Sequence, residues 1–261
     1  MAALQWNLRG IGANSAELSY LLDNLRPKVV CLQETKLPPN HNYRPPKTYS
    51  AYHQIHTDNL IASGGNTILV NNKTLHRQIP LTTQLQATAI RATLHKAITV
   101  CSIYIPPERH LHLRELDELR DQLPKPYIIL GDLNAHSSLW DSHWTDAPNN
   151  RGKVVEDFLA HTDTVLLNTG TATYRNSHTL RTSAIDLTMC SPELATELQW
   201  SALDDTHGSD HMPITLTPDT PSTATPPIFL TLEKQTGQVL RGTAAKFLQR
   251  TCLVFLKLCL A

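Results

Sequence analysis

The sequence predicts a layered α/β domain, and three observations lead to that prediction. An apolar strand-like run at 3–7, a helical segment that ends before Pro27 and a second apolar run at 29–32 form a strand–helix–strand order, which implies neighbouring parallel strands. A further run, Tyr127–Leu130, is apolar throughout and reads as a buried strand. It ends in a polar tip, Gly131–Ser137, and in layered α/β domains such tips face the crevice where ligands bind.

The composition is that of a globular protein without a net positive charge that would attract nucleic acid. The 261 residues are 41% hydrophobic and 18% charged, enough for one large domain or for one domain and a tail. Lys and Arg together number 23, as do Asp and Glu, so the formal net charge is zero. Any contact with nucleic acid must therefore use a local patch.

The cysteines and the apolar segments indicate the compartment. The five cysteines are scattered without a Cys-x-x-Cys pair, which favours neither a zinc site nor a disulfide framework. Cys31, Cys101 and Cys190 lie in strand-like runs, where we expect small core residues in a reducing environment. The sequence begins without a signal peptide and has no apolar stretch long enough for a membrane span. We expect a nuclear or intracellular protein that is not secreted and has no membrane partner.

A change in composition near residue 217 divides the chain into three parts. The chemistry-bearing residues all lie in 1–217, which we expect to be the catalytic domain. Residues 218–229 are rich in Thr, Pro and Ser and are typical of a linker. Residues 230–261 form an unassigned tail that shows helical periodicity late on.

Alternation and turn residues predict the remaining strands. In chain order they cover 49–55, 67–70, 87–94, 98–105, 165–167, 171–174, 182–189 and 213–216. Only a short turn separates 87–94 from 98–105, so we expect these two strands to pair. The run Thr182–Met189 alternates strongly enough to be a single strand, with Ile185 on one face and Asp186 on the other.

Leucine spacing predicts three helices. The first follows Asn14 and Glu17, which resemble an N-cap and its capping-box partner. The second covers 111–123, and the third covers 154–159 after a polar turn at Asn149–Gly152.

Polar residues recur where apolar strands begin or end. A single Gly-Asp-Leu-Asn tip is also a good turn sequence, and one Glu after a strand is usually a solvated surface residue. Five strand ends carry polar groups, and Asp186 lies within a sixth strand, a repetition that is hard to explain as turns. The residues at the five ends are Asn7, Glu34, Tyr104, Asp132 with Asn134, and Asp210 with His211.

This set of side chains favours phosphoester hydrolysis. Carboxylates and amides without cysteine suit Mg²⁺, with Mn²⁺ as the alternative, and such an ion polarises a phosphoryl oxygen. An imidazole and an amide can share the charge that develops on a phosphate, while a free carboxylate can orient water. The sequence has neither a Gly-x-Ser-x-Gly elbow nor a P-loop, which argues against a serine hydrolase and an NTPase.

The order of these motifs resembles the endonuclease/exonuclease/phosphatase superfamily, which includes DNase I and the exonuclease III-type apurinic endonucleases. The superfamily motifs are Trp6-Asn7, Gln33-Glu34-Thr35, Tyr104, Gly131–Asn134, Ser183–Asp186 and Ser209-Asp210-His211. The chain more narrowly resembles the endonuclease of jockey-like non-LTR retrotransposons (LINEs) over about 3–217. That resemblance rests on Gln5–Gly10, Leu32–Thr35, Ile103–Pro107, Gly131–Ser137 with Trp140, Asn150–Gly152 and Ile185–Thr188.

The resemblance implies a four-layer α/β sandwich of the DNase I type, in which two mostly antiparallel sheets pack face to face with helices outside. It also implies a metal site, with Glu34 as ligand and Asn7 and Asp210 beside it. Ser183 and Ser209 are weaker correspondences, which would bind phosphate or shape the pocket.

The resemblance further implies catalytic roles for five residues. Asp132 would position the attacking water, and Asn134 would hold the phosphate. His211 would stabilise the developing phosphate charge, Asp186 would orient His211, and Tyr104 would assist on the phosphate side.

The implied activity is the nicking of double-stranded DNA to leave a 3′-hydroxyl that primes reverse transcription. In such elements a reverse transcriptase follows the endonuclease, but no Tyr/Phe-x-Asp-Asp polymerase signature occurs here, which suggests a truncated copy or a partial gene product. Two alternatives stay open: a phosphoesterase of the same fold that acts on inositol phosphates or lipids, and a non-catalytic DNA-binding remnant.

Overall fold

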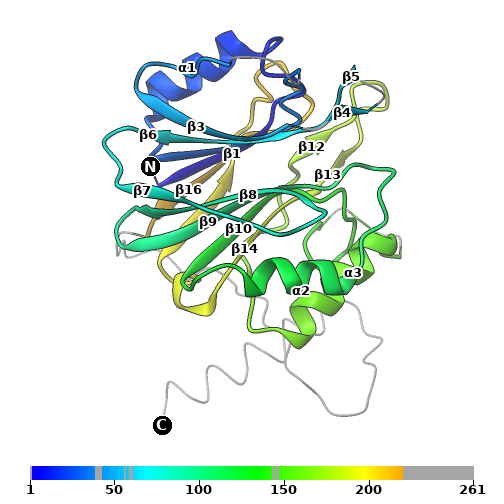
Figure 1. The fold of residues 1–261 in the computed structure, drawn as a ribbon. Coiled ribbons are helices and arrows are strands. Elements are labelled where there is room, and N and C mark those ends of the chain that lie inside the picture. The colour runs from blue at the N-terminus through cyan, green and yellow to red at the C-terminus, as the bar shows by residue number, and fades with distance from the viewer. Residues whose placement is uncertain are drawn as a thin grey trace. The chain divides into compact units, whose positions relative to one another are not determined.

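Two six-stranded sheets face each other in this computed structural model (Figure 1), which describes residues 2–38, 43–55, 57–58, 61–142, 144 and 147–219. The first sheet has the order β15 (Leu198–Ala202), β16 (Ile214–Pro218), β1 (Ala3–Asn7), β2 (Val29–Gln33), β6 (Asn66–Asn71) and β3 (Tyr49–Gln54). The second has the order β11 (Val165–Leu166), β14 (Asp186–Cys190), β10 (Tyr127–Asp132), β9 (Ala97–Tyr104), β8 (Gln86–Thr93) and β7 (His76–Ile79).

In the part of the chain that the structure describes, three helices cover the outer faces of the sheets. Helix α1 (Ser15–Leu25) lies outside the first sheet, and α2 (Leu113–Asp121) and α3 (Asn150–His161) lie outside the second (Figure 1). The smaller elements are β4 (Thr57–Asp58), β5 (Ile61–Ala62), β12 (Tyr174–Arg175), β13 (Thr182–Ser183) and the 3₁₀ turn η1 (Pro192–Leu194). The predicted four-layer sandwich is therefore confirmed.

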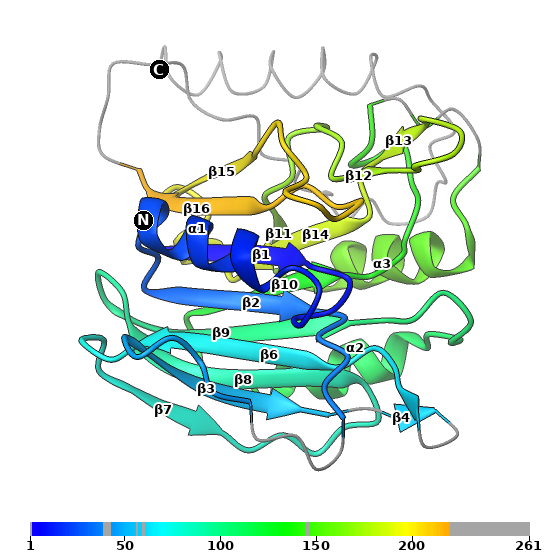
Figure 2. The ribbon, with the colours of Figure 1, turned by 90° about the horizontal axis from the view of Figure 1, so that it is seen from above.

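Each sheet contains one parallel pair of neighbouring strands and is otherwise antiparallel. β1 and β2 run in the same direction (Figure 2), with Ala3 opposite Val29, as the strand–helix–strand order predicted. β9 and β10 form the second parallel pair. The predicted pairing of the strands near 87–94 and 98–105 is also confirmed, because β8 and β9 are antiparallel from Gln86 opposite Tyr104 to Thr93 opposite Ala97.

The alternation of side chains along the strands builds two apolar cores. Ala3 of β1, Val29 of β2 and Ile128 of β10 belong to the core between the sheets. Leu4 and Trp6, which point to the other face of β1, pack in the core that holds the α1 leucines. Because the period of a strand is two, the side chains of residues 5 and 7 share the inner face with Ala3.

The prediction of a single strand over Thr182–Met189 is wrong, because the strand is interrupted at Ala184 and Ile185. β13 pairs with β12 in a separate hairpin, and β14 begins at Asp186. Where the strand is interrupted, side-chain oxygens accept hydrogen bonds from the backbone N–H groups. Asp141 Oδ2 accepts from Ala184 N at 2.9 Å, and Thr173 Oγ1 accepts from Ile185 N at 3.1 Å. Of the predicted strand 171–174, only Tyr174 lies in a strand.

Two predicted helix starts also need correction. Asn149–Gly152 is not a turn before α3 but its cap and first turn, because Asn149 Oδ1 accepts from Gly152 N at 2.7 Å. Asn14 does not form the predicted capping box of α1. Its side chain makes no capping bond and instead donates to Leu8 O at 2.6 Å, while Glu17 contacts His207.

The C-terminal predictions extend past the described residues. β16 runs to Pro218, two residues beyond the predicted strand end, and Asp219 N donates to Glu197 O at 2.8 Å. The rest of the predicted linker and the tail at 230–261 lie outside the described residues. No helix in the part of the chain that the structure describes is long and apolar enough to cross a membrane.

Replacing Gly152 with alanine should destabilise the fold, although alanine is the better helix former. A Cβ at this position would lie 2.0 Å from His136 O, and overpacking of this kind costs about 1–3 kcal/mol. Urea unfolding followed by circular dichroism measures the effect. Gly12→Ala is the control, because its Cβ meets nothing within 4 Å and should change stability by less than about 0.5 kcal/mol. Equal stability of the two variants would contradict this account of α3.

Candidate active site

Three predicted site residues lie side by side across three strands of the second sheet. Tyr104 and Asp132 end the parallel strands β9 and β10 and are partners in the register. β14 runs antiparallel to β10, so its first residue, Asp186, lies opposite Asp132. The break at Ala184 and Ile185 therefore places a carboxylate at the start of β14 beside the end of β10.

Other predicted site residues lie against these three, and the side-chain amide of Asn7, from the first sheet, lies at the centre of the site. Asn7 Nδ2 donates to Glu34 Oε1 at 3.1 Å and to Asp132 Oδ2 at 2.9 Å. It also lies 3.4 Å from His211 Nε2. One buried amide thus contacts groups from both sheets and from the segment before β16.

His211 is held by Asp186. Its Nδ1 lies 2.8 Å from Asp186 Oδ2, and both side chains are buried. Burial opposes the charged imidazole, but the carboxylates of Asp186, Asp132 and Asp210 outweigh it and raise the pKa of His211 to about 9. The ring is therefore protonated at neutral pH. Its Nε2 lies 3.9 Å from both Asp132 and Asp210, too far for a hydrogen bond, so Nε2–H is available to a ligand.

Asp132 is fully buried and is held by amides. Its Oδ1 accepts from Asn134 N at 2.9 Å, and its Oδ2 accepts from Asn7 Nδ2. Burial raises its pKa, the charge of His211 works against this, and Asp186 adds to it. The result is a carboxylate with a raised pKa and therefore a higher affinity for protons than an exposed one.

Asn134 adopts a left-handed backbone with φ of 50°, which Asn tolerates better than most residues. Its Nδ2 donates to Ile105 O at 3.1 Å. This contact holds the amide beside Asp132, at the end of β10 and next to the loop that follows Tyr104.

Glu34 and Tyr104 form a second pair at the edge of the site. The Tyr104 hydroxyl donates to Glu34 Oε1 at 3.1 Å, and Lys36 Nζ lies 3.0 Å from Glu34 Oε2. Burial alone would raise the pKa of Glu34, but the bonds from Asn7, Lys36 and Tyr104 outweigh it and lower that pKa. Burial first, and then the Glu34 and Asp132 carboxylates, strongly raise the pKa of Tyr104, so its hydroxyl stays a donor.

The predicted metal ligands supply oxygen donors but not a closed cluster. Glu34 and Asp210 keep 19% and 15% of their side chains exposed, and each faces a cation, Lys36 at 3.0 Å and Arg9 at 3.4 Å. This part of the site therefore favours positive charge. Within the described residues, no three Asp, Glu, His or Cys side chains are grouped closely enough to hold an ion.

The two predicted serines have different surroundings. Ser209 Oγ donates to Asn7 O at 2.7 Å and accepts from His211 N at 3.2 Å, so it ties two site residues together. Ser183 lies in β13, where its carbonyl accepts from Thr173 N at 2.9 Å. The structure places Ser183 in the hairpin next to the site.

Sequence reasoning missed two residues that support the His211–Asp186 pair. Thr173 is fully buried, and its hydroxyl donates to Asp186 Oδ2 at 2.7 Å. The ring of Tyr174 lies against that of His211, with 4.9 Å between centroids. Neither residue ends a strong apolar strand, so the signal that found the others was absent.

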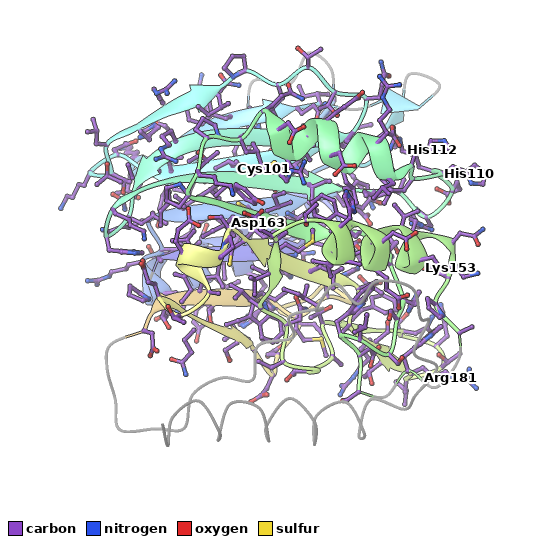
Figure 3. All side chains as sticks on the ribbon, turned by 90° about the horizontal axis from the view of Figure 1, so that it is seen from below. Cys101, His110, His112, Lys153, Asp163 and Arg181 are labelled. Atoms are coloured by element: carbon purple, nitrogen blue, oxygen red, sulfur yellow. The ribbon has the colours of Figure 1, made fainter. Side chains whose placement is uncertain are left out.

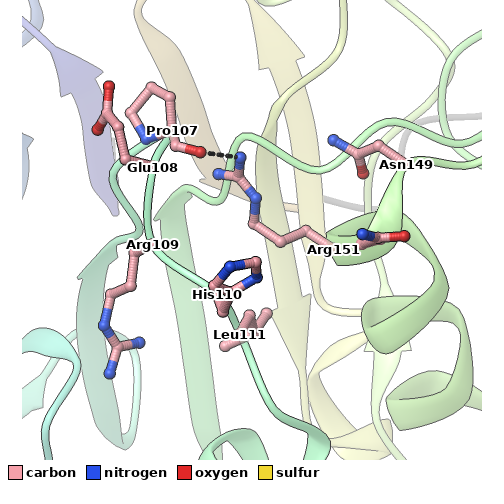
Figure 4. Close-up of a pocket in the computed structure, with 8 residues that line it drawn as sticks. Pro107, Glu108, Arg109, His110, Leu111, Asn149 and Arg151 are labelled. Atoms are coloured by element: carbon pink, nitrogen blue, oxygen red, sulfur yellow. Dashed lines mark hydrogen bonds between the residues drawn. The ribbon is translucent and has the colours of Figure 1, made fainter.

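A hollow of about 250 Å³ lies between the loop that follows Tyr104 and the first turn of α3 (Figure 4). It is lined by residues 107–111 and 149–151. Asn149 Nδ2 donates to Asn134 O at 3.0 Å. The Arg151 guanidinium donates to Pro106 O at 3.2 Å and to Pro107 O at 2.6 Å. These bonds join the hollow to the loop after Tyr104.

Comparisons of sequence relate this chain to endonuclease and retrotransposon proteins. A family model described as Endonuclease-reverse transcriptase matches residues 98–215. The chain is 27% identical over 214 residues to the RNA-directed DNA polymerase from mobile element jockey of Drosophila melanogaster. The match covers 80% of this chain, which spans only 23% of that relative.

Solved structures share the fold at lower identity. The endonuclease domain of TRAS1, a telomere-specific non-LTR retrotransposon, is 23% identical, with a TM-score of 0.67 over 82% of this chain and 95% of that one. A 3′-5′ exonuclease from Neisseria meningitidis is 18% identical, with a TM-score of 0.65 over 84% and 100%. The AP endonuclease LMAP from Leishmania major is 16% identical, with a TM-score of 0.62 over 82% and 86%.

The imidazole of His211 should titrate far above an ordinary histidine in the metal-free protein. We expect a pKa of about 9, because three carboxylates surround the ring. Asp186→Asn should lower it by about 1–3 pH units, since it removes the nearest charge and leaves the burial. Histidine NMR titration measures both values. A wild-type pKa near 6.5, or no change in the variant, would contradict the ion pair.

Proposed function

We propose, from the confirmed resemblance of this chain to the endonuclease/exonuclease/phosphatase superfamily and to its jockey-like retrotransposon members, that it is a metal-dependent endonuclease that nicks DNA. The observation that carries the proposal is the contact of the Asn7 amide with Glu34, Asp132 and His211. That contact brings together the Asp132 carboxylate as proton acceptor, the protonated imidazole of His211 and the Glu34 carboxylate as a metal ligand.

The residues of the chain divide the work of phosphodiester hydrolysis. Asp132 orients the attacking water and accepts its proton, which its raised pKa favours. His211 donates from Nε2 to a phosphate oxygen and offsets the charge that develops there. Asp186 holds the imidazole protonated and aimed. Asn134 and the Tyr104 hydroxyl supply further donors to the phosphate.

Glu34, with Asn7 and Asp210 beside it, would hold Mg²⁺ or Mn²⁺. The carboxylate oxygens of Glu34 and Asp210 suit a hard cation and already face two cationic side chains. Asn7 Nδ2 donates to Glu34 Oε1 and so orients that carboxylate. The ion would supply positive charge that polarises the phosphoryl group. Lys36 Nζ would leave Glu34 Oε2 when the ion binds.

The substrate that we propose is double-stranded DNA, and basic side chains support a nucleic acid substrate. Basic side chains line the edge of the molecule toward which β1 and β2 point, including His110, His112, Lys153 and Arg181 (Figures 2 and 3). Side chains that carry positive charge can meet phosphates although the net charge of the chain is zero.

The likeness to a retrotransposon polymerase suggests a use for the cut strand. We propose that the nick leaves a 3′-hydroxyl from which a reverse transcriptase, as partner, primes synthesis. This activity requires access to chromosomal DNA, so we propose that the protein is nuclear or otherwise intracellular and is not secreted. Residues 1–217 would form the catalytic domain, followed by the linker and the tail.

A supercoiled-plasmid assay tests the proposal directly. Wild type should nick with Mg²⁺ and not with EDTA, and His211→Ala should lose at least about 10³-fold in rate. His161→Ala is the matched control, because this exposed histidine pairs with Asp117 outside the site. Polymerase extension from the nick checks for the 3′-hydroxyl. A folded wild type that hydrolyses soluble phosphoesters but leaves the plasmid intact would overturn DNA as the substrate.

A further inference from the structure

Two glutamines lie where the alternation of the first sheet predicts apolar side chains. The inner face of β1 carries Ala3, Gln5 and Asn7, and that of β2 carries Val29, Cys31 and Gln33. Both glutamines are fully buried. A buried amide is costly unless it is hydrogen-bonded, so their bonds show what they are for.

The glutamine bonds cross from one sheet to the other. Gln5 Nε2 donates to Asp186 Oδ1 of the second sheet at 2.8 Å and to Gln33 Oε1 at 3.1 Å. Gln33 Nε2 in turn donates to Ser102 Oγ of β9 at 2.9 Å. The four side chains form a polar link between the sheets directly behind the His211–Asp186 pair.

The orientation of the Gln5 amide is set by its neighbours. Its Nε2 faces two oxygens, the Asp186 carboxylate and the Gln33 carbonyl, while its Oε1 is buried and has no partner among the described residues. A flipped amide would bring three oxygens together. The side chain therefore forgoes one hydrogen bond in order to present its donor to Asp186.

Gln5 completes the support of the Asp186 carboxylate. Oδ2 accepts from Thr173 and contacts His211 Nδ1, and Oδ1 accepts from Gln5. With donors on both oxygens, the carboxylate cannot rotate without breaking a bond. Since His211 is oriented by Oδ2, the direction of its Nε2 depends on the contact at Oδ1.

We propose that Gln5 is a positioning residue that acts through Asp186, and that Gln33 and Ser102 hold its amide in the required orientation. The link sets the position of His211, which comes from the segment before β16, relative to Asp132 of the second sheet. This inference deepens the proposed function and rests on it for the role of His211, but the geometry itself can be tested without activity.

The main test compares Gln5→Met with wild type. Methionine fills the same volume without a donor, so Asp186 Oδ1 loses its partner. We expect kcat for nicking to fall about 10- to 100-fold, the effect of one hydrogen bond to a charged group, with KM unchanged. The NMR signal of the His211 Nδ1–H proton, held in its bond to Asp186, should shift or broaden. Gln33→Met should change both readouts in the same direction but less.

Asn66→Leu is the matched control. Asn66 is a fully buried amide that also crosses between the sheets, since its Nδ2 donates to Gln86 O at 3.3 Å, but it does not bond Asp186 or His211. The melting temperature of the Asn66→Leu variant should fall about as much as that of the Gln5→Met variant. Its kcat for nicking and its His211 Nδ1–H signal should stay at wild-type values.

Three outcomes decide the matter. A wild-type signal and kcat in Gln5→Met would overturn the proposal. An equal loss of both in Asn66→Leu would also overturn it, because the effect would then be general packing. If the signal changes only in the Gln5 and Gln33 variants but wild type nicks no DNA, the positioning role stands and the proposed function fails.

Discussion

The burial of two carboxylates between two sheets is the constraint on which the rest of the site depends. Asp132 and Asp186 are fully buried, and an unpaired charge in such a position is too costly to keep. Hydrogen-bond donors and a cation therefore contact both carboxylates: Asn7, Gln5, Thr173 and the protonated His211. The partly exposed Glu34 is under less constraint, and its partner Lys36 is more exposed still.

The same constraint explains why the sandwich is apolar along most of its interior and polar where the site strands meet. Ala3 and Val29 pack in the core between the sheets, while Gln5 and Asn7 continue the same face of β1 with amides. The change from an apolar to a polar inner face along a single strand means that different residues stabilise the fold and form the site. The apolar part holds the sheets together, and the polar part can be arranged for substrate.

The elements and the site differ in how far sequence reasoning reaches. Strong apolar runs ending in polar residues identified Asn7, Glu34, Tyr104 and Asp132, because strand ends are local features. The break before Asp186 depends on side chains from distant segments, Thr173 and Asp141, which accept hydrogen bonds from the backbone there. The cap at Asn149 is a local contact with Gly152, but it lies in a polar stretch without apolar periodicity. Periodicity carries no information on such contacts, so the run 182–189 was predicted as one strand.

The account holds that groups from both sheets form a single catalytic unit. Single-turnover nicking by Asp132→Asn, His211→Ala and the double variant tests this most directly. Residues that act as a unit are non-additive, so the double variant should be about as slow as the slower single variant. Losses that multiply in the double variant would mean that Asp132 and His211 act independently, and the central claim would be contradicted.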